Sequence, residues 1–503
     1  MSYQAQIARL ILCALLVCVA APTFACAQAS VQTPPQNAQT QQSSSPASDS
    51  GSTTSQNPSQ PAAPNPQELY DPAEPDKVTL LPHSDTEGYW ISAQANVVFQ
   101  WHPSFPAKYT GTNSMTPGAQ SATTHVITLY TGWTVTPTTE LFADFEYATG
   151  GGVGRAFGLA GYVNLDSVRT VSGAQLSTTP YLARLMLRQI IPLTDEKTTA
   201  ERDEFHLATS LPVRRIEFRI GKFDLADFFD LNTWGQDSHL QFLNWTVDNN
   251  GAYDYAANTR GYTDGALLEY DDHWFAARFA VAMEPKVANG INLDADIARA
   301  RAENLELQAS GKLIAHRAGT VRLLSYLNQA NMGNYKQAIA EFLDHETATP
   351  NIIDTRRQGR HRYGFGLNFE QSLTDDIGVF GRLGWSDGRN ESWAYTEDDR
   401  ELELGAFSMG TPWHRRNDRA GVAFVANGIV AAHQQYLGFG GLGFLLGDGA
   451  LTYGPEKIFE GFYTVHLWSG FFASFDFQHI NNPGYNQDRG PITVPGLRLH
   501  VDF

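Results

Sequence analysis

The sequence predicts an all-β protein, an antiparallel transmembrane β-barrel of about 16 strands (16–18) with short periplasmic turns and long extracellular loops. Three observations predict this fold. Apolar and polar residues alternate with a period of two, the chain ends in Phe503, and no apolar run beyond the N-terminus is long enough for a membrane-spanning helix. The net charge of −18 excludes a nucleic-acid binder, which needs a basic face. The aromatic content of 12% excludes a mostly disordered chain.

Residues 1–27 have the pattern of an export signal peptide. A single positive charge, Arg9, precedes an apolar stretch from Leu10 to Ala21, and the small-residue site Ala25-Cys26-Ala27 follows. The apolar stretch is about a dozen residues long, which is too short to span a membrane. We therefore expect cleavage after Ala27. All 3 cysteines lie in this segment, so the exported protein is expected to carry no thiol.

Residues 28–87 are rich in Gln, Ser, Thr, Pro and Ala and contain almost no large apolar side chain. Such a composition cannot bury a core, so we predict a flexible tether on the periplasmic side of the membrane. Aromatic segments flanked by glycine begin at Gly88 and continue to Phe503. We therefore expect residues 88–503 to form one folded domain, the outer-membrane barrel.

The last strands show the alternation most clearly, with one apolar face and one polar face. A tight turn at Trp468-Ser469-Gly470 would pair apolar residues across a hairpin. The expected pairs are Leu467 with Phe471, Val465 with Ala473, Tyr463 with Phe475 and Gly461 with Phe477. A second hairpin, turning at Thr374-Asp375-Asp376, would pair Phe369 with Ile377, Leu367 with Val379, Phe365 with Gly381 and Tyr363 with Leu383. An apolar belt outside and charge inside are typical of a barrel around a water-filled lumen.

The same criterion applied along the chain predicts sixteen strands, an even number as expected of bacterial barrels. Their centres are expected near residues 95, 130, 145, 185, 217, 267, 278, 310, 324, 366, 381, 405, 422, 462, 475 and 498. Short and long connections alternate between them. We therefore expect long segments such as 223–263 and 330–360 to be outer loops, some of them folding inward.

Four segments resemble those of a known family: RIGKFDLADFFDLN from Arg219, HQQYLGFGGLGFLLGDGALTYGPE from His433, FQHINNPGYNQ from Phe477 and the terminal VPGLRLHVDF. On these segments the chain resembles the carbohydrate-selective porins of the OprB-type family over most of its length after residue 87. The resemblance implies an outer-membrane channel for passive uptake of mono- and oligosaccharides. Its implied partners are sugars, outer-membrane lipid and the barrel-assembly machinery, which would recognise the terminal Phe503. Which sugar passes, and whether barrels associate into a homo-oligomer, stay open.

Two other patterns are given no function. Gly438, Gly440 and Gly443 satisfy a GxGxxG spacing, but no βαβ unit surrounds them, so no nucleotide site is predicted. The acidic and histidine residues at 344–346 end an amphipathic stretch that predicts a short, solvated loop helix rather than a metal site. We predict no cofactor and no metal.

One strand and the loop after it carry the candidate site. In 215–220, every second residue is apolar and would face lipid, which turns Arg215, Glu217 and Arg219 inward. Charged groups suit the vicinal hydroxyls of sugars, and tryptophan rings suit their apolar faces. The predicted pore-lining, substrate-contacting residues are Arg215, Glu217, Arg219, Lys222, Asp224, Trp234, Trp245, Arg184 and Arg382. The alternative is that inward arginines and glutamates only pair across the wall and hold its shape.

Two other functions are considered. A general outer-membrane diffusion porin, or one for anions or aromatic acids, would share the barrel but not the four family segments. A barrel enzyme would need a nucleophile beside a base on one face, and the hairpins above offer no such pair. We therefore predict a channel and not an enzyme.

Overall fold

A computed structural model describes residues 78–83, 87–167 and 176–503. The predicted signal peptide, residues 1–27, lies outside the described residues, as does most of the predicted tether, residues 28–87. Among the described residues no helix is long and apolar enough to cross a membrane.

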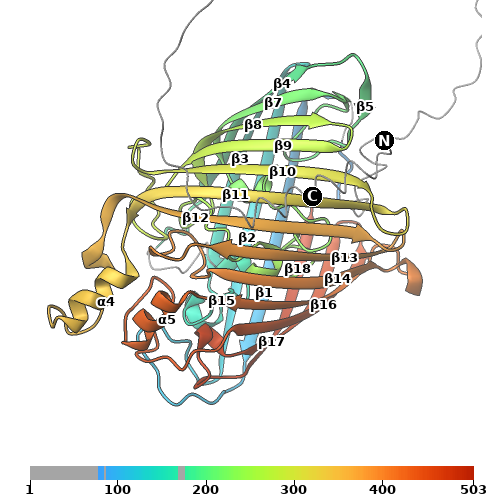
Figure 1. Cartoon of the computed structure of the whole chain (residues 1–503). Coiled ribbons are helices and arrows are strands. Elements are labelled where there is room, and N and C mark those ends of the chain that lie inside the picture. Colours follow the sequence, from blue (N-terminus) through green and yellow to red (C-terminus); the bar gives the residue numbers. More distant parts are fainter. Residues whose placement is uncertain (1–77, 84–86, 168–175) are drawn as a thin grey trace, which may run out of the picture. The chain divides into compact units, whose positions relative to one another are not determined.

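In the described part of the chain, sixteen antiparallel strands close into a barrel, with β1 hydrogen-bonded to both β2 and β18 (Figure 1). These strands are β1 Tyr89–His102, β2 Gln120–Thr136, β3 Thr139–Gly150, β4 Tyr181–Pro192, β7 Arg215–Phe223, β8 Thr263–Asp272, β9 Phe275–Met283, β10 Arg301–Lys312, β11 Ala318–Met332, β12 Arg357–Ser372, β13 Ile377–Ser386, β14 Arg400–Met409, β15 Arg419–Gly428, β16 Glu456–Trp468, β17 Phe471–Asn481 and β18 Ile492–Asp502. Each of the sixteen predicted centres falls inside one of them. The predicted fold class is confirmed.

The connections carry the remaining elements. A two-stranded sheet of β5 Lys197–Thr199 and β6 Ser210–Pro212 lies between β4 and β7. The α-helices among the described residues are α3 Trp245–Asp248, α4 Tyr335–Leu343 and α5 Ala431–Gly438. The 3₁₀ turns are η1 Val153–Ala156, η2 Leu165–Ser167, η3 Leu225–Asp227, η4 Ile353–Thr355, η5 Thr411–Trp413 and η6 Pro483–Tyr485. Figure 1 shows α4 and α5 at one end of the barrel and the chain's C-terminus at the other. Following the usual orientation, we call these the outer and the periplasmic end.

The predicted register is right in one hairpin and wrong in the other. Between β16 and β17, Val465, Tyr463 and Gly461 have the predicted partners. Phe471 faces Trp468 instead of Leu467, because a bulge interrupts the register next to the turn. Between β12 and β13, Leu367 pairs with Leu383 and not with Val379.

This second error has a simple cause. Strand β12 continues through the polar residues Gln371 and Ser372, which the predicted pairing of Phe369 with Ile377 left unpaired. The turn is therefore the short segment 373–376, closed by hydrogen bonds from the Asp376 and Ile377 amides to the Thr374 hydroxyl. The shift amounts to four residues, an even number, so each side chain keeps its predicted face.

The two faces of the wall differ as the alternation predicts. Outward side chains such as Phe365, Leu383 and Phe475 are 43–49% exposed in the isolated chain, as expected of a surface that lipid covers. Inward neighbours such as Arg362 and Arg382 are no more than 1% exposed. The lumen is therefore packed with polar side chains and with loop segments that fold into it.

The N-terminal residues of the described chain contact the closing strand at the periplasmic end. The Leu80 amide donates to the Asp502 carbonyl (2.8 Å), and the His83 Nε2 lies 2.9 Å from the Phe503 carbonyl. A Cβ on Gly470 would lie 2.0 Å from the Asp502 carbonyl oxygen. Only glycine fits this turn, because the turn, the last strand and residue 80 meet there.

Heating in detergent should shift the electrophoretic mobility of the protein. Every strand of the barrel is paired on both sides, so detergent alone cannot open it without breaking whole ladders of hydrogen bonds. The measurement compares heated with unheated samples by electrophoresis and records circular dichroism. One band position in both samples, together with a helical spectrum, would contradict the barrel.

Candidate functional site

The segment between β7 and β8, residues 224–262, folds into the lumen. It contains η3 and α3, and most of its residues are buried. It is held chiefly through its backbone. Inward carboxylates of the wall accept hydrogen bonds from its amides: Glu306 from Asp230, Glu370 from Thr233, Glu460 from Leu243 and Asn244, and Glu401 from Gly251. We call these four glutamates the wall latches.

The clearest latch is Glu460 on β16. Its Oε1 accepts from the Leu243 amide at 2.6 Å, and both of its carboxylate oxygens lie 3.2 Å from the Asn244 amide. Asn244 is the N-cap of α3, and its side chain accepts from the Thr246 amide. At the other end of α3, Arg382 donates to the carbonyls of Val247 and Asp248. These contacts satisfy backbone groups that a helix leaves unpaired at its two ends.

A second glutamate of β16 holds another inward segment. Glu456 accepts from the amides of Ala160 and Gly161, which follow η1, and from Gly484 in η6.

Buried ionisable residues also connect the outer loops to one another. His433 of α5 lies 3.8 Å from Glu397 and 3.7 Å from Asp399 and stacks on Tyr335 of α4. Burial raises the pKa of Glu397, and the imidazole of His433 opposes that shift.

Charged residues of the wall form a continuous ion-pair network across β3, β4, β7, β8, β9 and β10. Its chain runs through Glu140, Arg188, Glu217, Arg219, Glu269, Arg278 and Glu306, with N···O distances of 2.6–2.9 Å. Arg215 joins it through Glu217 (2.6 Å) and Asp271 (3.2 Å). The three predicted residues of β7 are therefore neighbours in one network, and all three are buried.

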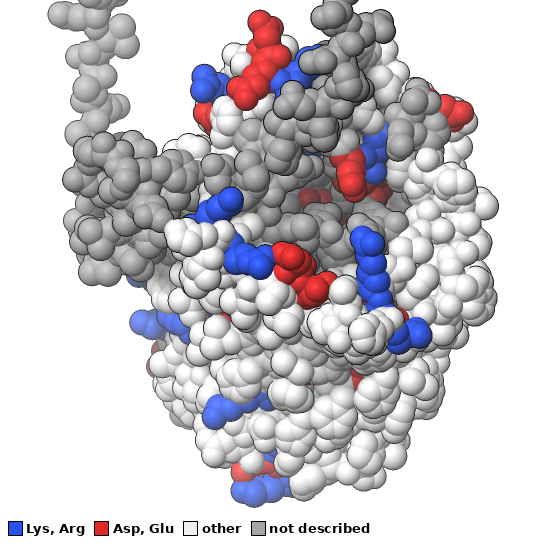
Figure 2. All heavy atoms as spheres, turned by 90° about the vertical axis from the view of Figure 1, so that its right-hand side faces the viewer, with Lys and Arg blue, Asp and Glu red and all other residues white. Residues whose placement is uncertain are grey.

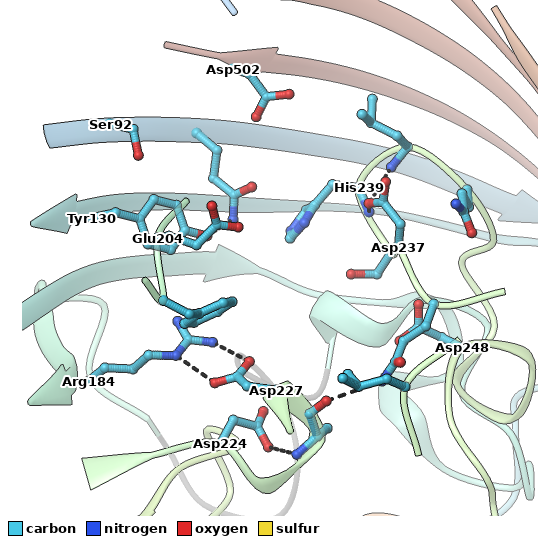
Figure 3. A pocket seen from close by; sticks show the side chains of 18 of the residues that line it. Ser92, Tyr130, Arg184, Glu204, Asp224, Asp227, Asp237, His239, Asp248 and Asp502 are labelled. Atoms are coloured by element: carbon cyan, nitrogen blue, oxygen red, sulfur yellow. Dashed lines mark hydrogen bonds and ion pairs between the residues drawn. The ribbon is translucent and has the colours of Figure 1, made fainter. Parts of the chain in front are cut away.

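A cavity of about 970 Å³ lies inside the barrel toward the periplasmic end. Figure 2 faces that end, where acidic and basic side chains lie around a hollow. Its walls come from the strands β1, β2, β4 and β18, from the β4–β7 connection and from the inward segment 224–262. Figure 3 shows Ser92 and Tyr130 on one side, facing Asp224, Asp227 and Asp248 on the inward segment.

Arginines in the cavity wall are fixed by partners. Arg184 forms a bidentate pair with Asp227 (2.7 Å for both bonds) and lies 3.6 Å from Asp144 (Figure 3). Its guanidinium also lies 5.0 Å from the ring centre of Phe205, while Arg260 lies 3.7 Å above the ring of Tyr181. An arginine that is paired and lies beside an aromatic ring keeps its orientation, and its remaining N–H groups can donate to a solute.

Aromatic rings cluster at the inner part of the cavity. Trp245 lies 4.8 Å from Tyr395 and 6.0 Å from Tyr255, measured between ring centres, and these two tyrosines are 5.4 Å apart. All three rings line the cavity. They provide an apolar patch among charged groups.

The structure separates the predicted site residues into two groups. Arg184, Asp224 and Trp245 line the cavity. The others are absent from the cavity lining. Five of them lie in the wall, and Trp234 lies within the inward segment; the five are Arg215, Glu217, Arg219, Lys222 and Arg382. Lys222 donates to the Leu182 carbonyl (2.8 Å), and Trp234 packs 5.3 Å from Phe407. The sequence pattern thus identified the inward face but could not separate lining residues from supporting ones.

Sequence reasoning missed several lining residues. Tyr130, Tyr255, Tyr262, Tyr395, Arg260 and Asp248 all face the cavity. Only Tyr130 could have been identified from the sequence, because it lies on β2, where inward and outward side chains alternate. The rest lie on loops, where no period indicates which side chains point toward solute.

Replacing Glu460 by alanine should raise single-channel conductance. The change leaves the buried amides of Leu243 and Asn244 without an acceptor, at a cost of about 1–3 kcal/mol each, so the inward segment should loosen and the lumen widen. Glu460→Gln keeps an acceptor oxygen and should have a smaller effect. The matched control is Phe459→Ala, the neighbouring lipid-facing position. Equal conductance of Glu460→Ala and wild type in planar bilayers would contradict the latch.

The comparisons with known proteins agree with this architecture. Residues 145–503 match the family model described as carbohydrate-selective porin, OprB family. The high pH structure of Pseudomonas putida OprB is similar to this chain at a TM-score of 0.60 and 13% identity, over 83% of this chain and 94% of that one. At that identity the likeness shows the fold alone.

Two further solved structures align less well. The low pH structure of the same Pseudomonas putida protein has a TM-score of 0.44 at 11% identity, over 83% of this chain and 93% of its own. The outer membrane channel DcaP of Acinetobacter baumannii has a TM-score of 0.45 at 9% identity, over 82% and 97%. None of the curated proteins matches the sequence. The family match over residues 145–503 confirms the resemblance drawn from the sequence: the chain belongs to the OprB family of carbohydrate-selective porins.

Proposed function

We propose that sugars cross the outer membrane passively through the cavity described above, and that its lining makes the channel prefer sugars to other solutes of equal size. Membership of the family makes the chain a carbohydrate channel of the outer membrane. The observation that carries the finer proposal is the cavity of about 970 Å³, which combines fixed arginines, carboxylates and a cluster of aromatic rings.

This lining suits the chemistry of a sugar. A pyranose presents vicinal hydroxyls, which exchange hydrogen bonds with guanidinium and carboxylate groups, and an apolar ring face, which packs on aromatic rings. Each contact replaces a contact with water, so its net contribution is small. Weak binding is what a channel needs, because a solute that is held tightly blocks the passage.

The predicted site residues receive different roles in this proposal. Arg184, Asp224 and Trp245 contact the solute. Arg215, Glu217 and Arg219 maintain the wall through the ion-pair network, and Arg382 holds the end of α3. We infer from this division that changes in the network alter the shape of the barrel, whereas changes at the lining alter the interaction with sugars.

The proposal is tested by liposome swelling with neutral solutes of rising size, combined with sugar block of the ion current. We expect glucose and short maltodextrins to enter faster than polyethylene glycols of the same size and to reduce the current in a saturable way. A general diffusion porin would instead order all solutes by size alone and show no saturable block. That outcome would contradict sugar selectivity while leaving the channel itself in place.

We also propose how the chain reaches the outer membrane. Residues 1–27 are removed after Ala27 during export, and residues 28–87 are a spacer on the periplasmic side. The C-terminal strand is the signal that the barrel-assembly machinery recognises. The proposal for the C-terminus is supported by alternation in β18, where Leu497, Leu499 and Val501 face outward up to the terminal Phe503. Whether barrels then associate into a homo-oligomer is a separate question.

Deleting Phe503, or replacing Val501 and Phe503 by aspartate, should prevent assembly in the outer membrane without affecting export. A charge on the lipid face costs about 2–4 kcal/mol at the midplane and less near an interface, so the main loss is expected in recognition of the strand. Immunoblotting of separated periplasm and outer membrane measures the result. Normal amounts of heat-shifting barrel in the outer membrane would show that this terminus is not the signal.

A further inference from the structure

The connection between β4 and β7 differs from the other connections at the periplasmic end. It comprises residues 193–214, whereas the longest of the others in the described chain is 410–418. Turns at this end of an outer-membrane barrel are usually short. Strands β5 and β6 pair within the connection, and beyond them the Ala200 amide donates to the Thr209 carbonyl at 3.0 Å. The connection is therefore a long hairpin, and we call residues 201–208 its tip.

The tip folds into the lumen and is held there. The Leu207 amide donates to Oε1 of Glu140 at 3.1 Å, and Glu140 is an inward, buried carboxylate of β3. The Leu207 side chain is buried as well. The ring of Phe205 lies 6.1 Å from the ring of Phe228 in the inward segment, measured between ring centres. The tip is therefore docked against both the wall and the inward segment, and its place is fixed.

Side chains at the tip and at its base face the cavity. Glu201, Glu204 and Thr209 all belong to the cavity wall. Glu201 and Thr209 are exposed and Glu204 is partly exposed, so a solute can contact all three. Figure 3 shows Glu204 beside Tyr130 of β2. Because the cavity lies toward the periplasmic end, a solute that leaves it on that side passes the tip.

Residues 78–83 border the same exit. His83 lines the cavity, and its ring lies 4.3 Å from the ring of Trp90 at the start of β1. The guanidinium of Arg202 at the tip lies 5.8 Å from the centre of the Trp90 ring and donates to the Tyr89 carbonyl at 2.8 Å. The tip and residues 78–83 therefore both lie against Trp90.

We propose that the tip and residues 78–83 form the constriction that sets the largest solute able to leave the channel on the periplasmic side. Selection in a pore follows from its diameter and from the groups that line it. At the periplasmic end the wall strands alone would leave the opening as wide as the barrel, and the two segments reduce it. Because Glu140 fixes the tip, the constriction is permanent and selects by size. The proposal rests on the route through the cavity given above, and not on the preference for sugars.

The first test places a thiol at the tip or at its base. Residues 28–503 contain no cysteine, so Glu201→Cys or Thr209→Cys gives the channel a single thiol after the predicted cleavage site. A bulky, uncharged methanethiosulfonate reagent is added on the periplasmic side of a planar bilayer. It should cause a stepwise loss of single-channel current, because the attached group occupies the narrowest part of the exit.

The matched control is Asp195→Cys. Asp195 is exposed on the same connection but is absent from the cavity lining, so this variant, like Glu201→Cys, removes one carboxylate. The reagent should leave its current unchanged. An unchanged current in both Glu201→Cys and Thr209→Cys, or an equal loss in Asp195→Cys, would overturn the constriction.

The second test removes the tip. Because Ala200 and Thr209 are paired at its base, an Asn-Gly turn can replace residues 201–208 and close the hairpin. The largest polyethylene glycol that enters the open channel should then shift to a higher mass, and the conductance should rise. Polyethylene glycols measure size without the chemistry of a sugar. The heat-dependent mobility shift verifies the barrel, and an unchanged size limit in the folded variant would contradict the proposal.

Failure of the constriction and failure of the proposed function give different results. If wild type is blocked by glucose while the thiol variants keep their current and the shortened variant keeps the size limit of wild type, the constriction is wrong and the sugar channel stands. If the thiol and shortened variants behave as expected but wild type is not blocked by glucose and orders all solutes by size, the sugar preference fails and the constriction stands.

Discussion

The structure depends on hydrogen bonds between inward carboxylates of the barrel wall and backbone amides of the segments that fold into the lumen. Glu456 and Glu460 of β16 each bind two or more amides, and Glu306, Glu370 and Glu401 bind one each. A carboxylate bonded to an amide is a strong, charge-assisted contact. Because this contact uses the backbone of the loop, the loop side chains can face the solute.

Inward carboxylates of the wall have two kinds of partner in this arrangement. Part of the inward charge pairs with arginine in the network from Glu140 to Glu306, and part receives backbone amides. Removing either kind of partner would leave a buried charge, which costs more than the contact itself contributes. The wall and the inward segments therefore stabilise each other, and the cavity is the space that they leave.

The sequence predicted the barrel better than the site, for a physical reason. All sixteen strands were predictable because the membrane imposes one apolar face and the lumen one polar face on every strand. The turn of the hairpin at 373–376 was predicted correctly, but its register was wrong, because the predicted pairing of Phe369 with Ile377 left Gln371 and Ser372 unpaired although β12 runs through both. Which side chains line the cavity depends on how the loops fold. The alternation therefore could not distinguish Arg184, which lines the cavity, from Arg215 and Arg219, which do not, and it did not identify Asp248.

The central claim is that wall carboxylates hold the inward segments through their backbone amides. Hydrogen exchange of those amides tests it most directly. If carboxylates of the wall hold the inward segments, the amides of Gly161, Leu243 and Asn244 exchange as slowly as those of the neighbouring strands. Exchange at these amides requires breaking a hydrogen bond to Glu456 or Glu460 inside the barrel. In Glu460→Ala, Leu243 and Asn244 should exchange faster while Gly161 stays protected by Glu456. Fast exchange of all three amides in the folded wild-type barrel would contradict the account.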